Sequence, residues 1–265
     1  MQTVIAEAPS RATVAARASA VLELRQYTLR AGRRDSLIEL FEREFIEPQE
    51  AEGMELVGQF RDLDAPDRFV WLRGFADHPT RDAALAAFYG GPTWRTHRSA
   101  ANATMLDSDD VLLLRPARPA GGFALPARTE TTGDDDTPDD GRPDRGVVVA
   151  TVHHLRQRDP AEFIAAFERD WLPLLWDSNI GVQATLVTDP SRNGFPALPV
   201  REGESVFVWF RCHASLARAA QAQARLDEAL EWAPRLAESL QPFEARPPQV
   251  LRLAPTPRSR LRGDA

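Results

Sequence analysis

A row of polar side chains lies in the first strongly alternating segment of the sequence, VLELRQYTL. With a period of two, Glu23, Arg25 and Tyr27 share one face of a strand, and the intervening leucines share the other. We expect the leucines to lie beneath helices, which places a carboxylate, a guanidinium and a phenol on the opposite face. The planar fork of arginine suits carboxylates and oxyanions, and a phenol can donate a proton to a carbonyl. Arg25 is therefore a candidate substrate-binding residue, and Tyr27 is a candidate catalytic residue.

A second segment, FVWLRGFA, places Trp71 and Arg73 on one face, and it recurs later as FVWFRCHA with Trp209 and Arg211. An arginine that is buried in a sheet must be paired, because an isolated buried charge is very costly. Two interpretations stay open. The arginines form internal ion pairs, most simply with Glu23 or with a carboxylate of the other repeat, or they clamp an anionic or carbonyl-bearing ligand. In the second interpretation Arg73 is catalytic, and Trp71, Trp209 and Arg211 bind substrate.

The segment AFYGGPTWRTHRSAAN has aromatic and polar residues on either side of a predicted helix break. Gly90–Pro92 should interrupt the helix, and irregular segments of this kind often border a pocket. Trp94 and His97 are three residues apart and share a helical face. His97 is a candidate catalytic residue for proton transfer, because histidine titrates near neutrality. The residues that we assign here to substrate binding are Tyr89, Trp94 and Asn102.

Histidines are concentrated in the second half of the chain. His153 is a further catalytic candidate, on a strand that should neighbour the strand of His213. His153 and His154 point to opposite faces, so at most one of them can join His213. Two histidines are an incomplete set of metal ligands, so we predict no metal site, and His153 with His213 is the pair that a carboxylate would have to complete. Cys212 should face the helices as a buried, inert thiol.

Composition excludes several kinds of chemistry. All 32 basic residues are arginine, which removes Schiff-base lysines and the lysine of phosphate-binding loops. The single cysteine excludes an internal disulfide and a multi-cysteine metal site. A net charge of −7 argues against binding nucleic acid, and no apolar run is long enough for a membrane span. We predict no cofactor and a cytoplasmic protein.

Two blocks of similar size must position these residues. The pairs FEREF and FERDW, FVWLRGFA and FVWFRCHA, and VLLLRP and VLRLAP occur in the same order, which indicates a duplicated unit. Each unit has the order strand, helix, strand, strand, helix, strand. In such a ferredoxin-like unit one face of the sheet is left without helices and needs a partner. The predicted fold class is therefore α+β, with two ferredoxin-like βαββαβ units packed sheet to sheet as an intramolecular dimeric α+β barrel.

The same patterns predict the boundaries. The second unit has a Pro/Gly-rich insertion at 188–203 and a long, uninterrupted second helix at 216–240. The predicted parts are a disordered leader at 1–20, a first unit at 21–117, a disordered acidic linker at 118–146, a second, diverged unit at 147–254 and a flexible tail at 255–265.

The stretches ELRQYTLRAGRRDSLIELFE, GQFRDLDAPDRFVWLRGF, AFYGGPTWRTHRSAANATM and DVLLLRP resemble the NIPSNAP family, over nearly all of the first unit. The second unit resembles it more weakly, because it keeps the FVW-x-R strand and the FER helix but lacks the ELRxY, AGRRD and FYGGPxW segments. The resemblance implies the dimeric α+β barrel superfamily, whose members include cofactor-free monooxygenases, haem-degrading enzymes, lactone isomerases and cyclases. It therefore implies the fold and leaves the chemistry open.

The function that these residues favour is a cofactor-independent enzyme of bacterial secondary metabolism, which oxidises, cyclises or isomerises a conjugated or aromatic metabolite. Aromatic walls would hold the substrate, and the polar groups would stabilise an enolate-like oxyanion. Two alternatives stay open: a non-catalytic protein that binds a small ligand or haem, and an interaction scaffold whose polar residues join the two sheets. The expected partner is a small molecule, and an exposed sheet edge or helix face would still allow a homo-oligomer.

Overall fold

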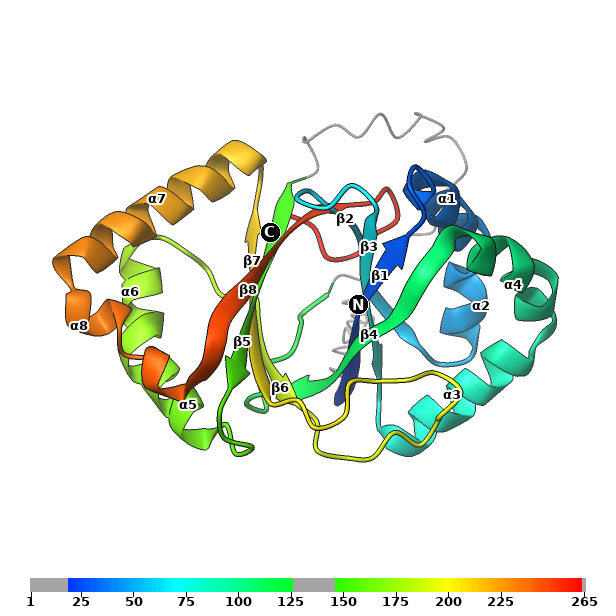
Figure 1. The fold of residues 1–265 in the computed structure, drawn as a ribbon, viewed down its shortest axis with the longest axis horizontal. Helices are drawn as coiled ribbons and strands as arrows, with labels where there is room; N and C mark the ends of the chain where they lie inside the picture. Colours follow the sequence, from blue (N-terminus) through cyan, green and yellow to red (C-terminus); the bar gives the residue numbers. More distant parts are fainter. Residues whose placement is uncertain (1–18, 126–145, 264–265) are drawn as a thin grey trace, which may run out of the picture.

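The computed structural model describes residues 19–125 and 146–263, and their strands close an antiparallel barrel in the order β1-β3-β2-β8-β5-β7-β6-β4. Two layers of helices flank the barrel on opposite sides (Figure 1). The predicted intramolecular α+β barrel of two ferredoxin-like units is therefore confirmed. Residues 1–18 of the predicted leader and 126–145 of the predicted linker lie outside the described residues.

The first unit supplies one half of the barrel and the helices on one side of it. Its strands are β1 (Val21–Leu29), β2 (Glu55–Asp62), β3 (Arg68–Phe75) and β4 (Met105–Pro116), and its helices are α1 (Arg34–Glu44), α2 (Ile46–Ala51), α3 (His78–Gly90) and α4 (Pro92–Thr104). The alternating segments VLELRQYTL and RFVWLRGF form β1 and β3, the central strand pair of this unit. The predicted break is present between α3 and α4, where a Cβ on Gly91 would press against the carbonyl oxygen of Ala87.

The second unit repeats this order on the other side. Its strands are β5 (Val147–Leu155), β6 (Ala184–Thr188), β7 (Val206–His213) and β8 (Glu244–Pro255); its helical segments are α5 (Ala161–Ala166), a π-helical turn η2 (Phe167–Trp171), α6 (Leu172–Asp177), α7 (Leu216–Trp232), α8 (Pro234–Ala237) and a 3-10 turn η3 (Gln241–Phe243). The prediction of one uninterrupted helix over 216–240 is wrong. The helix ends at Trp232 because Pro234 has no N–H to continue it.

Two seams join the units. β2 pairs with β8, with Phe60 opposite Pro255, and β4 pairs with β6, with Leu114 opposite Thr188. The interior of the barrel is filled by apolar side chains from both units, among them Leu22, Leu24, Val57, Val70, Leu72, Val148, Ala150, Val208, Phe210 and Leu253. Each sheet therefore buries both faces, one against the other sheet and one against its own helices.

The predicted faces of β1 are reversed. Leu22 and Leu24 pack inside the barrel, whereas Tyr27 belongs to the separate cluster beneath the helices of the first unit. Cys212 likewise packs against the barrel interior rather than the helices. The reason is that the barrel interior is itself a dry apolar core, which takes the most uniformly apolar face of each strand. The polar row therefore lies between the sheet and α1–α4.

The chain after β8 packs against the barrel, so its part within the described residues is not the predicted flexible tail. Thr256 donates its backbone N–H to Gln59, and Leu261 donates to Val57, which extends the contact of β8 with β2. The side chain of Leu261 joins the barrel core. On the other side of β4, Phe123 packs on Phe210 at 5.0 Å between ring centroids, so the first residues of the predicted linker are also ordered by packing.

No helix within residues 19–125 and 146–263 has both the length and the apolar character needed to span a membrane.

Candidate functional site

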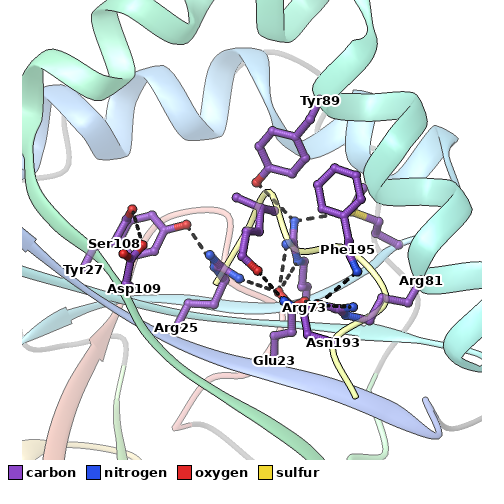
Figure 2. A network of polar contacts seen from close by, with 12 residues as sticks. Glu23, Arg25, Tyr27, Arg73, Arg81, Tyr89, Ser108, Asp109, Asn193 and Phe195 are labelled. Carbon is purple, nitrogen blue, oxygen red and sulfur yellow. Dashed lines mark hydrogen bonds and ion pairs between the residues drawn. The ribbon is translucent and has the colours of Figure 1, made fainter. Parts of the chain in front are cut away.

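A fully buried carboxylate, Glu23, lies at the centre of the first unit, between the sheet and the helices (Figure 2). Three arginines surround it. Arg25 Nη1 lies 2.7 Å and Arg73 Nε 2.8 Å from Oε2, and Arg81 Nε lies 2.8 Å from Oε1. The internal ion-pair interpretation of Arg25 and Arg73 is therefore the one that the structure shows, and neither guanidinium is free to clamp a ligand through these atoms.

Strand register and a capped helix explain the cluster. Glu23 lies directly opposite Arg73 in the β1–β3 pair, and Arg25 is two residues along the same face. Arg81 comes from the first turns of α3, which begin at a defined point because the Asp77 carboxylate accepts a hydrogen bond from Thr80 N at 2.7 Å. Sequence reasoning missed Arg81. It lies four residues after the capping Asp77, but nothing in a helical sequence shows that this arginine reaches a strand carboxylate.

The cluster carries more positive than negative charge. Burial raises the pKa of the Glu23 carboxyl, but the Coulombic attraction of Arg73, Arg25 and Arg81 outweighs this and holds that pKa well below its usual range. Arg73 also contacts the side-chain oxygen of Gln49 at 3.1 Å. The excess positive charge is directed at the neighbouring aromatic residues, with Arg25 5.4 Å from the centre of the Tyr27 ring.

A small cavity of about 30 Å³ lies next to this cluster, under the helices α1 to α4. Aromatic and apolar side chains dominate its lining, which consists of Tyr27, Leu37, Phe41, Phe45, Gln49, Trp71, Phe88, Tyr89, Trp94 and Met105. The rings meet edge to face, as Tyr27 and Trp71 do at 5.8 Å between centroids. In this closed arrangement the cavity has about the volume of one water molecule. An aromatic ligand would enter only if the half-buried Tyr89 and Trp94 moved.

Two residues of the cavity lining carry neutral donors whose hydrogens have no acceptor among the described residues. Tyr27 Oη accepts a hydrogen bond from Arg25 Nε at 2.9 Å, so its own hydrogen remains free to be donated. Burial raises the pKa of Tyr27, although Arg25 opposes this, so the phenol stays protonated at neutral pH. Trp71 is 2% exposed, and its Nε1 has no hydrogen-bond partner among the described residues. Such a buried donor is costly unless something accepts from it.

The structure brings together some of the predicted site residues of the first unit and separates others. Tyr27, Trp71, Tyr89 and Trp94 line the cavity, with Arg25 and Arg73 directly behind it. His97 lies outside the cavity lining, where its Nε2 is 3.4 Å from Glu44 Oε2 on the surface. Asn102 is exposed on α4. The helical face shared by Trp94 and His97 was predicted correctly, but only Trp94 is near enough to the sheet to reach the cavity.

The matching place in the second unit is occupied by a hydrogen-bonded chain. Trp209 Nε1 donates to His153 Nε2 at 3.1 Å, and His153 Nδ1 lies 2.6 Å from Glu244 Oε1. Both ring nitrogens of His153 are thus engaged, so it has no free atom for catalysis. Arg211 lies on the same face, over the Trp209 ring at 5.3 Å.

His153 and His213 cannot form the metal pair considered above. In the β5–β7 register His213 lies opposite Val147, whereas His153 lies opposite Phe207, so the two histidines are at opposite ends of the strand pair. His154 is separate again, with Nδ1 3.3 Å from Glu204. Within the described ranges, no three His, Cys, Asp or Glu side chains are close enough together to hold a metal ion.

The insertion at 188–203 extends from the second unit across the helices of the first (Figures 1 and 2). Asn193 accepts a hydrogen bond from Arg81 Nη1 at 3.1 Å, and the Phe195 ring stacks on Tyr89 at 6.2 Å. A Cβ on Gly194 would meet the carboxylate of Asp82, which would have to move aside, so the insertion approaches α3 closely at this point. The sequence identified the insertion, but its contact with the other unit is a tertiary feature.

Solved structures share this architecture over nearly the whole chain. An anthrone oxidase-like protein superposes with a TM-score of 0.54 at 12% identity, over 90% of this chain and 93% of its own. A candidate monooxygenase from Lactobacillus acidophilus gives 0.52 at 13% identity, over 89% and 94%. A second one, from Fusobacterium nucleatum, gives 0.52 at 8% identity, over 90% and 93%. These likenesses establish the fold. No curated protein matches the chain.

The sequence also matches the model of a protein family over residues 22–119. This range includes β1, β3, the α3–α4 break and every residue that lines the cavity. The part of the chain that carries the candidate site matches the model of the NIPSNAP family.

Proposed function

We propose that the cavity of the first unit binds a conjugated or aromatic small molecule through a carbonyl or phenolate oxygen, and that the protein transforms this molecule without a cofactor. The observation that carries the proposal is the pair of buried neutral donors, Tyr27 Oη–H and Trp71 Nε1–H, which line one cavity and have no acceptor for their hydrogens among the described residues. Donors of this kind stabilise an oxygen on which negative charge develops.

The arginine cluster supports the donors from behind. Arg25 holds the Tyr27 oxygen as an acceptor and so directs the phenol hydrogen away from itself. Arg73 and its Gln49 contact fix the floor of the cavity. Because the cluster retains positive charge after Glu23 is neutralised, it favours an anionic form of the bound molecule. Arg25 and Arg73 are thus positioning residues rather than ligand clamps.

The lining contains no carboxylate and no histidine. A substrate that becomes an enolate or phenolate must therefore lose its proton to water, which suits a molecule that is already acidic. Anthrones are of this kind, because a methylene beside two aromatic rings and opposite a ketone ionises to an aromatic phenolate. From that anion, return of a proton gives isomerisation. Reaction with O₂ converts the methylene to a carbonyl, with one oxygen atom retained and the other released as water.

The likeness to an anthrone oxidase-like protein and to candidate monooxygenases supports oxidation as the reaction to test first. The probe is anthrone. Its methylene exchange is followed by NMR in D₂O without oxygen, and O₂ uptake and anthraquinone formation are followed in air. We expect saturable acceleration of both in the wild type and a loss of about 100-fold in Tyr27→Phe, as for removal of one oxyanion donor. Trp71→Phe should also lose activity, and Trp232→Phe, at an exposed site on the other unit, is the matched control.

The same experiment separates the alternatives. Exchange without O₂ uptake would indicate an isomerase or cyclase. Saturable quenching of tryptophan fluorescence by anthrone without exchange would indicate a binding protein, which the lack of a base in the cavity also allows. Rates that are equal in the wild type and in Tyr27→Phe would contradict the proposal.

A further inference from the structure

We propose that Arg211, on the helix-facing side of the second sheet under α7, anchors a separate binding site for a small carboxylic acid, whose carboxylate takes the place that Glu23 occupies in the first unit.

Both units carry an arginine at the matching position of the FVW-x-R strand, but the residue opposite this arginine differs between them. Arg73 of β3 lies opposite Glu23, whereas its counterpart Arg211 of β7 lies opposite Val149. The helix arginine is missing as well. Arg81 is the fourth residue after the capping Asp77 of α3, and the fourth residue after the capping Ser215 of α7 is Ala219. The second unit thus keeps a strand arginine and lacks the carboxylate that would neutralise it.

Arg211 is deeply buried, with 5% of its surface exposed. Its Nη2 donates to the side-chain oxygen of Gln223, while Nε and Nη1 are buried without a hydrogen-bond partner among the described residues. Within those residues it forms no ion pair at 4.0 Å or less. The carboxylate of Asp227 attracts the guanidinium from a distance without forming an ion pair with it, and the amide of Gln223 donates to this carboxylate at 2.7 Å. Each of these two N–H groups can donate a charge-assisted hydrogen bond to a carboxylate oxygen.

The surroundings also favour an anion. His213 is two residues along the same face of β7, and its Nε2 is buried without a partner within the described part of the chain. Burial, with added repulsion from Arg211 and Arg225, lowers the pKa of His213 to about 4. His213 is therefore neutral at pH 7, and its imidazole remains available as a hydrogen-bonding group.

The apolar side chains near Arg211 determine which molecule can carry the carboxylate. Val147, Val149 and Ala219 form a small buried cluster, of which Val149 lies opposite Arg211 in the strand pair, and the Trp209 ring centre lies 5.3 Å from the guanidinium carbon. These side chains suit a short aliphatic or aromatic body. The approach is from the α7 side, where His213 and Gln223 are only partly buried. A small aromatic acid such as benzoate has both features, a planar carboxylate and an apolar ring.

The test is isothermal titration calorimetry of the full chain with benzoate, with benzamide as the neutral isostere and inorganic phosphate as a non-planar anion. We expect saturable binding of benzoate to the wild type and a dissociation constant at least about tenfold higher in Arg211→Met, because a charge-assisted pair is lost. Arg218→Met, at an exposed position of α7, should bind benzoate as the wild type does. Val149→Glu should also abolish binding, because it supplies the missing carboxylate internally.

Val149→Glu guards against misfolding of the arginine variant, since it leaves Arg211 in place. Loss of benzoate binding in both variants, with binding retained in Arg218→Met, would support the site. Equal binding of benzoate and benzamide, binding unaffected by Arg211→Met, or binding of phosphate alone would overturn it. Because the site lies in the second unit, Tyr27→Phe should leave benzoate affinity unchanged, which makes failure here distinguishable from failure of the first-unit proposal.

Discussion

The two units place the same tryptophan and the same arginine on the same strand, but they satisfy opposite members of the pair. In the first unit Arg73 is neutralised by Glu23, and the Trp71 N–H is left without an acceptor. In the second unit Trp209 donates to His153, and Arg211 is left without a carboxylate. Each unit therefore exposes a different kind of donor to a ligand.

This difference teaches that a repeated motif need not mean a repeated site. A neutral N–H with a phenol hydrogen suits a carbonyl or phenolate oxygen, whereas an unpaired guanidinium suits a full anionic charge. The substitutions that distinguish the two arrangements lie on the neighbouring strand, where Glu23 and Tyr27 of β1 correspond to Val149 and His153 of β5 in the matching registers. The predictions below test each half of the comparison.

The largest effect is expected from Glu23→Gln. The variant leaves three buried arginines without their shared carboxylate, and breaking a buried ion pair by removing one partner costs about 3–5 kcal/mol. Urea unfolding followed by circular dichroism measures this free energy. Glu44→Gln, which alters a carboxylate paired on the surface with Arg43, should leave the free energy of unfolding nearly unchanged.

Glu23→Gln should also change how the free energy of unfolding depends on pH. The pKa of Glu23 is lower in the folded than in the unfolded protein, so its contribution is present above the unfolded value of about 4.3 and is lost as the pH falls below it. Wild-type stability should decline more steeply than that of Glu23→Gln below about pH 5. Parallel declines would show that Glu23 does not neutralise the cluster.

A medium effect is expected from comparing Trp209→Phe with Trp71→Phe. Both remove the indole, but only Trp209→Phe breaks a hydrogen bond and leaves His153 Nε2 buried without its donor. We expect it to cost about 1–3 kcal/mol more than Trp71→Phe in the free energy of unfolding. Equal costs would mean that the indole of Trp71 is as well satisfied as that of Trp209, which would remove the basis of the first-unit proposal.

The smallest effect is a change in the titration of His213. Burial, Arg211 and Arg225 lower its pKa to about 4, so the unfolded state binds a proton that the folded state refuses, and stability should fall as the pH drops from about 6.5 toward 4. Arg211→Met should raise the pKa of His213, as followed by NMR of the imidazole. We expect no change in Arg218→Met. If the pKa of His213 were also unchanged in Arg211→Met, Arg211 and His213 would be too far apart to share a site.

The sequence was sufficient to predict the barrel and part of the cavity lining. Duplication, strand alternation and the Gly90–Pro92 break are local signals, and the residues that they singled out include Tyr27, Trp71, Tyr89 and Trp94, which line the cavity. The faces of β1 were assigned wrongly, because alternation distinguishes two faces but does not say which of two buried environments each one meets. The leucines fill the barrel, and the polar row lies under the helices.

Contacts between residues that are far apart in the sequence could not be predicted from local patterns. Arg81 and Asn193 are ordinary surface-type residues in their own segments, yet one reaches Glu23 and the other reaches Arg81. Their contacts depend on how α3 and the second-unit insertion are placed on the sheet. His97 shows the converse, since a well-spaced histidine shares the helical face of Trp94 and packs on Phe45, yet it pairs with Glu44 outside the cavity lining.

Because both halves of the barrel belong to one polypeptide, the molecule is free of the two-fold symmetry that two identical chains would impose. In a symmetric pair, any loop that crossed to the neighbour would appear twice, and any change in one pocket would be copied into the other. Here the segment with Asn193 and Phe195 contacts the first unit from the second. A mutation in this segment can therefore alter access to the first-unit cavity without a matching change on the other side of the barrel, so the two units can diverge independently.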